Sequence, residues 1–145
     1  MLNNYSLANP VLLDAVAQIK PFISIAQMVV MGNGCRTPES EFFVDKFKSM
    51  AERIKSMPVT YEQDGKGLDA MVYLHYFKNG SDWYITEKDM DGGVLQAFGY
   101  TVLNGDSEMA ELGYISIKEL VSFGVELDLH FEPCTLGEIK KKLGN

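Results

Sequence analysis

The chain has 145 residues, 46% of them hydrophobic, which suits one globular domain with a sizeable core and leaves no room for a second full domain. Its net charge of -7 is uneven: the balance is +1 over residues 1–60, -11 over residues 61–138, and residues 139–145 add three lysines. Such acidity disfavours direct nucleic-acid binding and favours a partner with a basic surface. The alternative that the acidity serves only solubility stays open.

Cysteine usage and hydropathy indicate a cytoplasmic setting. Cys35 and Cys134 are too few for a disulfide framework or a CxxC metal site, although a disulfide between them stays open. The N-terminus lacks the basic start and apolar run of a signal peptide. The longest apolar stretch, Ile23 to Met31, is interrupted by polar residues and is too short to span a bilayer. We therefore expect no membrane segment.

Two helices are expected in residues 1–56. Asn9-Pro10 can begin the first, and Pro21 ends or kinks it. The apolar residues 22–31 fit a buried helix or a core strand, and the absence of a turn signal before Gly32 favours the helix. The second helix is predicted from about Glu39 to Ser56, with these residues on its buried face: Phe42, Phe43, Phe47, Met50, Ala51 and Ile54.

A β-hairpin is predicted at the centre of the sheet. Met71 to Phe77 and Asp82 to Thr86 are rich in aromatic and β-branched residues, and Asn79-Gly80 between them suits a tight turn. A third strand is expected over Val94 to Leu103, with Gly99 as a bulge or a point of close contact.

Two further strands and two helices complete the expected fold. Leu112 to Ile115 reads as the fourth strand, and the alternation of Val125 to Phe131 predicts a half-buried fifth strand. Ser116 can cap a brief helix and Thr135 the basic C-terminal helix, which ends within residues 139–145. These elements predict an α+β single domain, with a mainly antiparallel sheet of about five strands packed against two N-terminal helices.

An ordered series of motifs covers about residues 57–138. It comprises PVTYEQDGKGLDA, the hairpin strands VYLHYF and WYITE, and then AFGYTV, AELGYIS and VELDLHFEP. In this order and spacing the motifs resemble the short proteins catalogued as domain of unknown function DUF2958. The resemblance implies a group met on plasmids, integrative elements and phages, often near conjugation or anti-restriction genes. It implies no catalytic residues, and residues 1–56, a helical N-terminal extension, lie outside it.

Acidic and aromatic residues at the far end of the hairpin predict a recognition edge. Trp83 and Tyr84 alternate across the strand, so one of them is expected in the core and the other on a surface that can bind a partner. A solvated acidic turn is the plainer alternative. The predicted partner-binding set is Asp82, Trp83, Tyr84, Glu87, Asp89, Asp91, Glu108 and Glu111.

The leading hypothesis is a non-enzymatic module that binds a basic protein surface and needs no cofactor. With the setting implied by the resemblance, the partner is expected to be a host defence complex, such as a CRISPR effector or a restriction enzyme, inhibited by charge mimicry.

Two alternatives stay open. One is a small metal-dependent enzyme that uses His75 and His130, although no HxH, HExxH or CxxC spacing is present. The other is an accessory subunit that self-associates as a homo-oligomer through residues 1–56, with Ile23 to Met31 as the interface.

Overall fold

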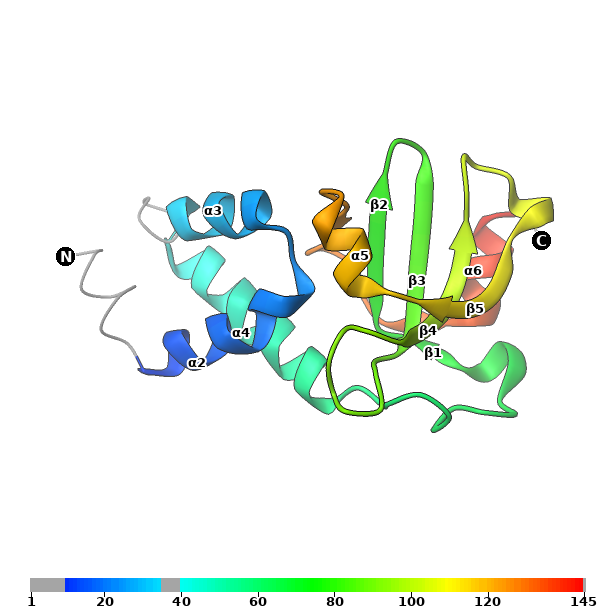
Figure 1. The fold of residues 1–145 in the computed structure, drawn as a ribbon, viewed down its shortest axis with the longest axis horizontal. Helices are drawn as coiled ribbons and strands as arrows, with labels where there is room; N and C mark the ends of the chain where they lie inside the picture. The colour runs from blue at the N-terminus through cyan, green and yellow to red at the C-terminus, as the bar shows by residue number, and fades with distance from the viewer. Residues whose placement is uncertain (1–9, 35–39, 145) are drawn as a thin grey trace.

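Helices form the N-terminal part of the molecule (Figure 1). The computed structural model describes residues 10–34 and 40–144. Pro21 lies in a 3₁₀ turn between the first two helices, because a proline ring cannot continue the helical hydrogen-bond ladder. Three α-helices therefore stand where two were expected, and the apolar stretch is helical from Ile25 onward. These elements are α2 (Pro10–Ile19), η1 (Lys20–Phe22), α3 (Ile25–Gly34) and α4 (Ser40–Ser56).

Helix α4 buries one stripe of side chains. Phe47, Met50 and Ile54 are buried at the spacing that places residues on one side of a helix, and Val44 joins them from one turn earlier. Phe42 precedes Phe47 by five positions, which is about 140° around the axis, and it is 50% exposed. The prediction that Phe42 lies on the buried face is therefore wrong.

A five-stranded antiparallel sheet forms the second part of the fold, in the order β5-β4-β3-β2-β6. β2 and β3 are joined by a tight turn at Asn79 and Gly80, whose φ angles of 50° and 81° are left-handed, as this turn requires. The predicted hairpin is confirmed from Leu74 onward, and β3 is the middle strand. Met71–Val72, predicted as the start of the same strand, instead pair with Cys134–Thr135. The bounds are β2 (Leu74–Lys78), β3 (Ser81–Glu87), β4 (Ala97–Val102), β5 (Glu111–Ile115) and β6 (Glu126–Leu127).

Gly99 allows β3 and β4 to approach closely. A Cβ atom at this position would lie 2.1 Å from the backbone oxygen of Tyr84. The ladder between the two strands shifts register beside it, between Ile85 and Glu87. The predicted bulge or close contact at Gly99 is confirmed.

The last strand of the sheet is shorter than predicted. Within residues 125–131 only Glu126–Leu127 pair with β2. Asp128 then donates its backbone N–H to the carbonyl oxygen of His75 (2.8 Å), and its carboxylate accepts from the backbone N–H of His130 (2.9 Å). The first bond still belongs to the pairing with β2, whereas the second turns the chain away from the sheet after Asp128, so the prediction of a strand across the whole stretch is wrong. The alternating pattern cannot show that a side chain will compete with the ladder.

Short elements flank the sheet. Ser116 and Thr135 cap the two C-terminal helices as predicted, each accepting a backbone N–H in the first turn. Buried residues of the last helix pack with Tyr84, Tyr100 and Val102 against one sheet face. These elements are η2 (Gly67–Asp69), η3 (Ser107–Met109), α5 (Ile117–Ser122), α6 (Leu136–Lys142) and the paired strands β1 (Met71–Val72) and β7 (Cys134–Thr135).

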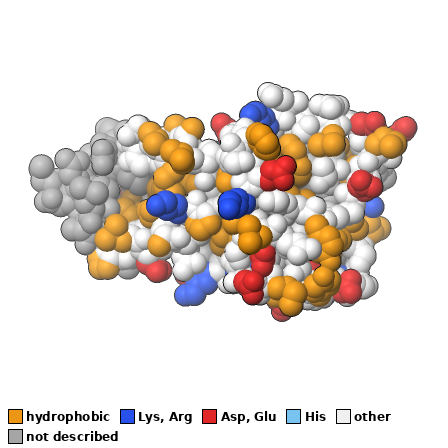
Figure 2. Space-filling view, viewed as in Figure 1, with side chains coloured by type: hydrophobic (Ala, Val, Ile, Leu, Met, Phe, Trp, Pro, Cys, Tyr) orange, Lys and Arg blue, Asp and Glu red, His pale blue; other side chains and the backbone are white. Residues whose placement is uncertain are grey.

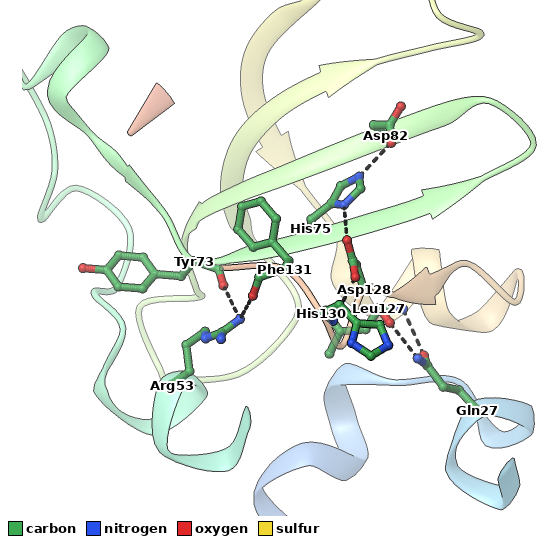
Figure 3. A network of polar contacts seen from close by, with 9 residues as sticks. All are labelled: Gln27, Arg53, Tyr73, His75, Asp82, Leu127, Asp128, His130 and Phe131. Atoms are coloured by element: carbon green, nitrogen blue, oxygen red, sulfur yellow. Dashed lines mark hydrogen bonds and ion pairs between the residues drawn. The ribbon is translucent and has the colours of Figure 1, made fainter. Parts of the chain in front are cut away.

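Helices and sheet share one core. A single buried cluster contains Phe47 of α4 and Tyr76 of β2, whose hydroxyl donates to the carbonyl oxygen of Phe22. The Gln27 amide both donates to the carbonyl oxygen and accepts from the N–H of Leu127, at 2.7 and 2.9 Å (Figure 3). The predicted α+β single domain is confirmed. In the described ranges, the helices are all too short or too polar to cross a membrane.

Candidate functional site

His75 on β2 lies between the carboxylates of Asp82 and Asp128 (Figure 3). Its Nε2 lies 2.7 Å from Oδ1 of Asp82, its Nδ1 lies 3.0 Å from Oδ2 of Asp128, and its ring stacks on Tyr84 at 4.6 Å. Ionised carboxylates only accept hydrogen bonds, so the imidazolium form satisfies both contacts at once. The arrangement fastens the β2–β3 hairpin to the turn after β6.

The two histidines do not converge. Only the backbone N–H of His130 joins the cluster, through Asp128, and its ring lies on the far side of Asp128 from His75 (Figure 3). In the part of the chain that the structure describes, no three His, Cys, Asp or Glu side chains are grouped to hold a metal ion. The metal-enzyme alternative therefore lacks the paired histidines that it requires. Cys35 lies outside the described residues.

Two predicted partner-binding carboxylates lie inside the protein. Glu87 is 5% exposed, and its oxygens accept from the backbone N–H of Tyr61 (2.8 Å) and the hydroxyl of Thr86 (3.2 Å). Asp89 is 8% exposed and accepts the backbone N–H groups of Asp91 and Gln96, which closes the loop between β3 and β4. Neither carboxylate lies on an outer surface, because each satisfies backbone donors of a folded-back segment.

The predicted aromatic pair divides between the two faces of the sheet. Tyr84 is buried under α6, and this burial, followed by the nearby Asp82, raises its pKa to about 12. Trp83 is half-buried and lines an open groove of about 560 Å³ between the sheet and α5. Tyr84 thus belongs to the core, whereas Trp83 can be reached from outside.

The exposed acidic residues do not form one continuous edge. Asp91 lies in the loop that precedes β4, whereas Glu108 lies in η3, beyond the other end of β4, and Glu111 pairs with Thr101 near that end. From Ala97 to Thr101, β4 rises about 3.3 Å per residue, which separates the two places by roughly 13 Å along the strand. The single recognition edge predicted from Asp82 to Asp91 is therefore divided, and its exposed carboxylates are gathered at opposite ends of the sheet.

Acidic and apolar side chains meet at the open side of β5. Figure 2 shows the two kinds of surface interleaved at the upper right, where Figure 1 places η3. β5 pairs with β4 alone, so its outer backbone edge has no strand neighbour among the described residues. Neither glutamate there is in an ion pair, since the ion pairs of the described residues all involve His75. We call this surface the β5 edge: Glu108, Met109, Glu111, Leu112 and Tyr114.

Sequence reasoning found the two glutamates of the β5 edge and missed its apolar members. Met109, Leu112 and Tyr114 are 76%, 45% and 53% exposed. The alternation in the predicted fourth strand could have indicated Leu112 and Tyr114 as a pair on one face. That this strand lies at the edge of the sheet follows only from the strand order.

Beside the β5 edge lies a pocket of about 530 Å³ that the sequence did not indicate. Residues of the 60–70 segment form one wall, and the face of β4 and β5 forms the other. Tyr61 has a φ of 79°, unusual for a residue with a side chain, and its hydroxyl lies 2.6 Å from that of Tyr114. Gln63, buried behind it, bonds with the backbone of Met71 and Thr86 and holds this wall in place.

Comparison with known proteins gives no relative from which residues can be transferred. The chain matches no family model, no curated protein and no solved structure. The resemblance to DUF2958 stays a prediction. Self-association through residues 1–56 also stays a prediction. It is consistent with three exposed apolar side chains of α3, because Ile25, Val29 and Val30 are 86%, 55% and 65% exposed.

Proposed function

We propose that the chain is a non-enzymatic protein-binding module that docks on a basic protein surface through the β5 edge. One observation carries the proposal: carboxylates outside any ion pair of the described residues and exposed apolar side chains lie together on β5, which has an open backbone edge, and on η3 just before it. An open edge can accept another strand through main-chain hydrogen bonds, while side chains select the partner. Carboxylates speed association with a basic partner and disfavour acidic ones.

The charge of the sheet region supports the same partner chemistry. Residues 61–138 carry a balance of -11, which repels nucleic acid and attracts surfaces that bind it. The apolar members of the β5 edge would supply the buried centre of the interface, and the glutamates its charged rim. Such binding requires no cofactor.

The class of partner rests on the resemblance to DUF2958. Mobile elements are targets of host defence complexes that bind nucleic acid, such as CRISPR effectors and restriction enzymes. In this proposal Glu108 and Glu111 occupy positions on the partner that otherwise hold phosphates, so nucleic acid is excluded. Asp82, which contacts His75, and Asp91, which lies in the loop before β4, are outside the β5 edge and are not required for this contact.

A charge-reversal pair tests the proposal. The partner is first captured from a host carrying defence systems and then purified, and its binding is measured by interferometry. The double variant Glu108→Lys, Glu111→Lys is expected to weaken binding by about tenfold or more, with an effect that shrinks as salt is added.

The matched control is Asp45→Lys, Glu52→Lys, which makes the same change in net charge on the exposed face of α4. The control is expected to bind like the unaltered protein. Equal losses in both variants would show that net charge alone governs binding, and unchanged binding in the β5 variant would refute the proposed surface.

A further inference from the structure

The pocket beside the β5 edge has carboxylates and no basic group in its wall. Glu87 and Asp64 are the ionisable acids that line it, and its lining residues include no Lys, Arg or His. Phe98, the cross-strand neighbour of Glu87, lines the pocket together with Leu112 and Leu136, and these three side chains are apolar. A hollow of this composition suits a ligand that is apolar along its length and positively charged at one end.

Glu87 is the buried carboxylate of this pocket. Its two observed donors, the backbone N–H of Tyr61 and the hydroxyl of Thr86, are both neutral. A carboxylate has about four acceptor positions, so it can take further hydrogen bonds from a ligand. A buried charge without a charged partner is costly, and a cation in the pocket would relieve that cost.

Three aromatic rings stand near this carboxylate. Tyr61 and Tyr114 meet through their hydroxyls, and Phe98 packs edge-on against Tyr114 with ring centroids 5.7 Å apart. Tyr61 adopts its positive φ at a position where this contact holds it, and such strain is typical of functional sites. Aromatic faces attract ammonium and guanidinium groups, most strongly where water is displaced.

We propose that this pocket binds an organic cation, a guanidinium or alkylammonium group on an apolar stem. The cation lies against Glu87 and the tyrosine rings, and its stem lies along Phe98 and Leu112. The cation can come from a free amine or from a basic side chain of a bound protein. Only the second source rests on the proposed function, because Leu112 and Tyr114 belong both to the pocket and to the β5 edge.

An NMR titration distinguishes these sources. The probes are butylguanidine as a free cation, N-acetyl-arginine methylamide as a peptide side chain, and N-acetyl-norleucine methylamide as a neutral compound of similar length. Shifts are expected at the backbone amides of Tyr61, Glu87, Phe98 and Tyr114 with either or both cations and not with the neutral probe. Binding of the free cation, alone or together with the capped arginine, indicates a free amine site, and binding of the capped arginine alone indicates a partner's side chain.

Variants test the assignment to Glu87. Glu87→Gln keeps an oxygen for the N–H of Tyr61 and is expected to weaken cation binding about tenfold to a hundredfold. Glu126→Gln, the same charge loss on the exposed β6, should leave it unchanged. Tyr114→Leu, at an exposed position, gives an independent loss should Glu87→Gln fail to fold.

Three outcomes would overturn the inference: neither cation binds, the neutral probe binds equally well, or both pocket variants bind cations like the unaltered protein. Each of them leaves the test of Glu108 and Glu111 untouched. Failure of that test in turn leaves the result with the free cation standing.

Discussion

Replacing Gly99 by alanine tests the close approach at the middle of the sheet. The new Cβ would lie 2.1 Å from the oxygen and 2.9 Å from the carbon of the Tyr84 carbonyl, and 3.0 Å from Cα of Ile85. All three atoms belong to the backbone of β3, so no side chain can rotate away. Since real Cβ contacts are almost never shorter than 3.0 Å, the two strands must separate by about 1 Å at this point.

This separation sets the magnitude. Overpacking costs about 1–3 kcal/mol, and weakening one or two ladder hydrogen bonds adds about 1 kcal/mol each. We expect Gly99→Ala to lower the free energy of unfolding by about 3 kcal/mol or more. Urea unfolding measures it, followed by the fluorescence of Trp83, the single tryptophan of the chain.

Gly113 supplies the matched control, because it faces Gly99 on β5 and a Cβ there would meet nothing within 4 Å. Gly113→Ala is expected to be neutral or to stabilise by up to about 1 kcal/mol, since alanine orders more readily in a strand than glycine. A loss below about 1 kcal/mol in Gly99→Ala, or equal losses at both glycines, would refute the reasoning.

Two further predictions concern buried ionisable groups. Burial raises the pKa of Tyr84 to about 12, above the value of about 10 in the unfolded chain, so ionisation of the phenol favours unfolding. The free energy of unfolding is therefore unaffected below pH 10 and falls as the pH rises towards 12. Tyr84→Phe should abolish about 1–2 kcal/mol of that alkaline loss, and an unchanged pH profile of urea midpoints would contradict the assignment. Lys88 donates from Nζ to the carbonyl oxygens of Ile54 and Lys55 at the end of α4. Lys88→Met should lower the thermal midpoint, at a cost of about 1–2 kcal/mol, whereas Lys55→Met at an exposed site should not; equal midpoints would show that the contacts contribute nothing.

Local patterns were sufficient where neighbours in the chain also make the contact. Asn79-Gly80 predicted its turn because few residue types adopt two successive positive φ angles. Ser116 and Thr135 predicted helix starts because a cap bonds only a few residues ahead. These signals, with hydrophobic alternation, were enough for the α+β class and for most strands.

Elsewhere the local sequence patterns gave wrong predictions, because contacts between residues distant in the chain decided the structure. The alternation at residues 125–131 read as a strand, but Asp128 binds His75, which lies 53 positions away. Glu87 was predicted as a partner-binding residue, but it is buried, and its carboxylate accepts a hydrogen bond from the backbone N–H of Tyr61. In both cases the decisive partner comes from another element of the fold.

The sequence by itself determined most of the elements, the central hairpin, the need for glycine at position 99 and the acidic character of the sheet region. Only the tertiary structure decided which carboxylates reach the surface, because burial depends on partners that pairing brings together. It also decided that β5 is an edge strand and that Tyr61 and Tyr114 meet over Glu87. The β5 edge and the pocket beside it therefore follow from strand order, which no local pattern specifies.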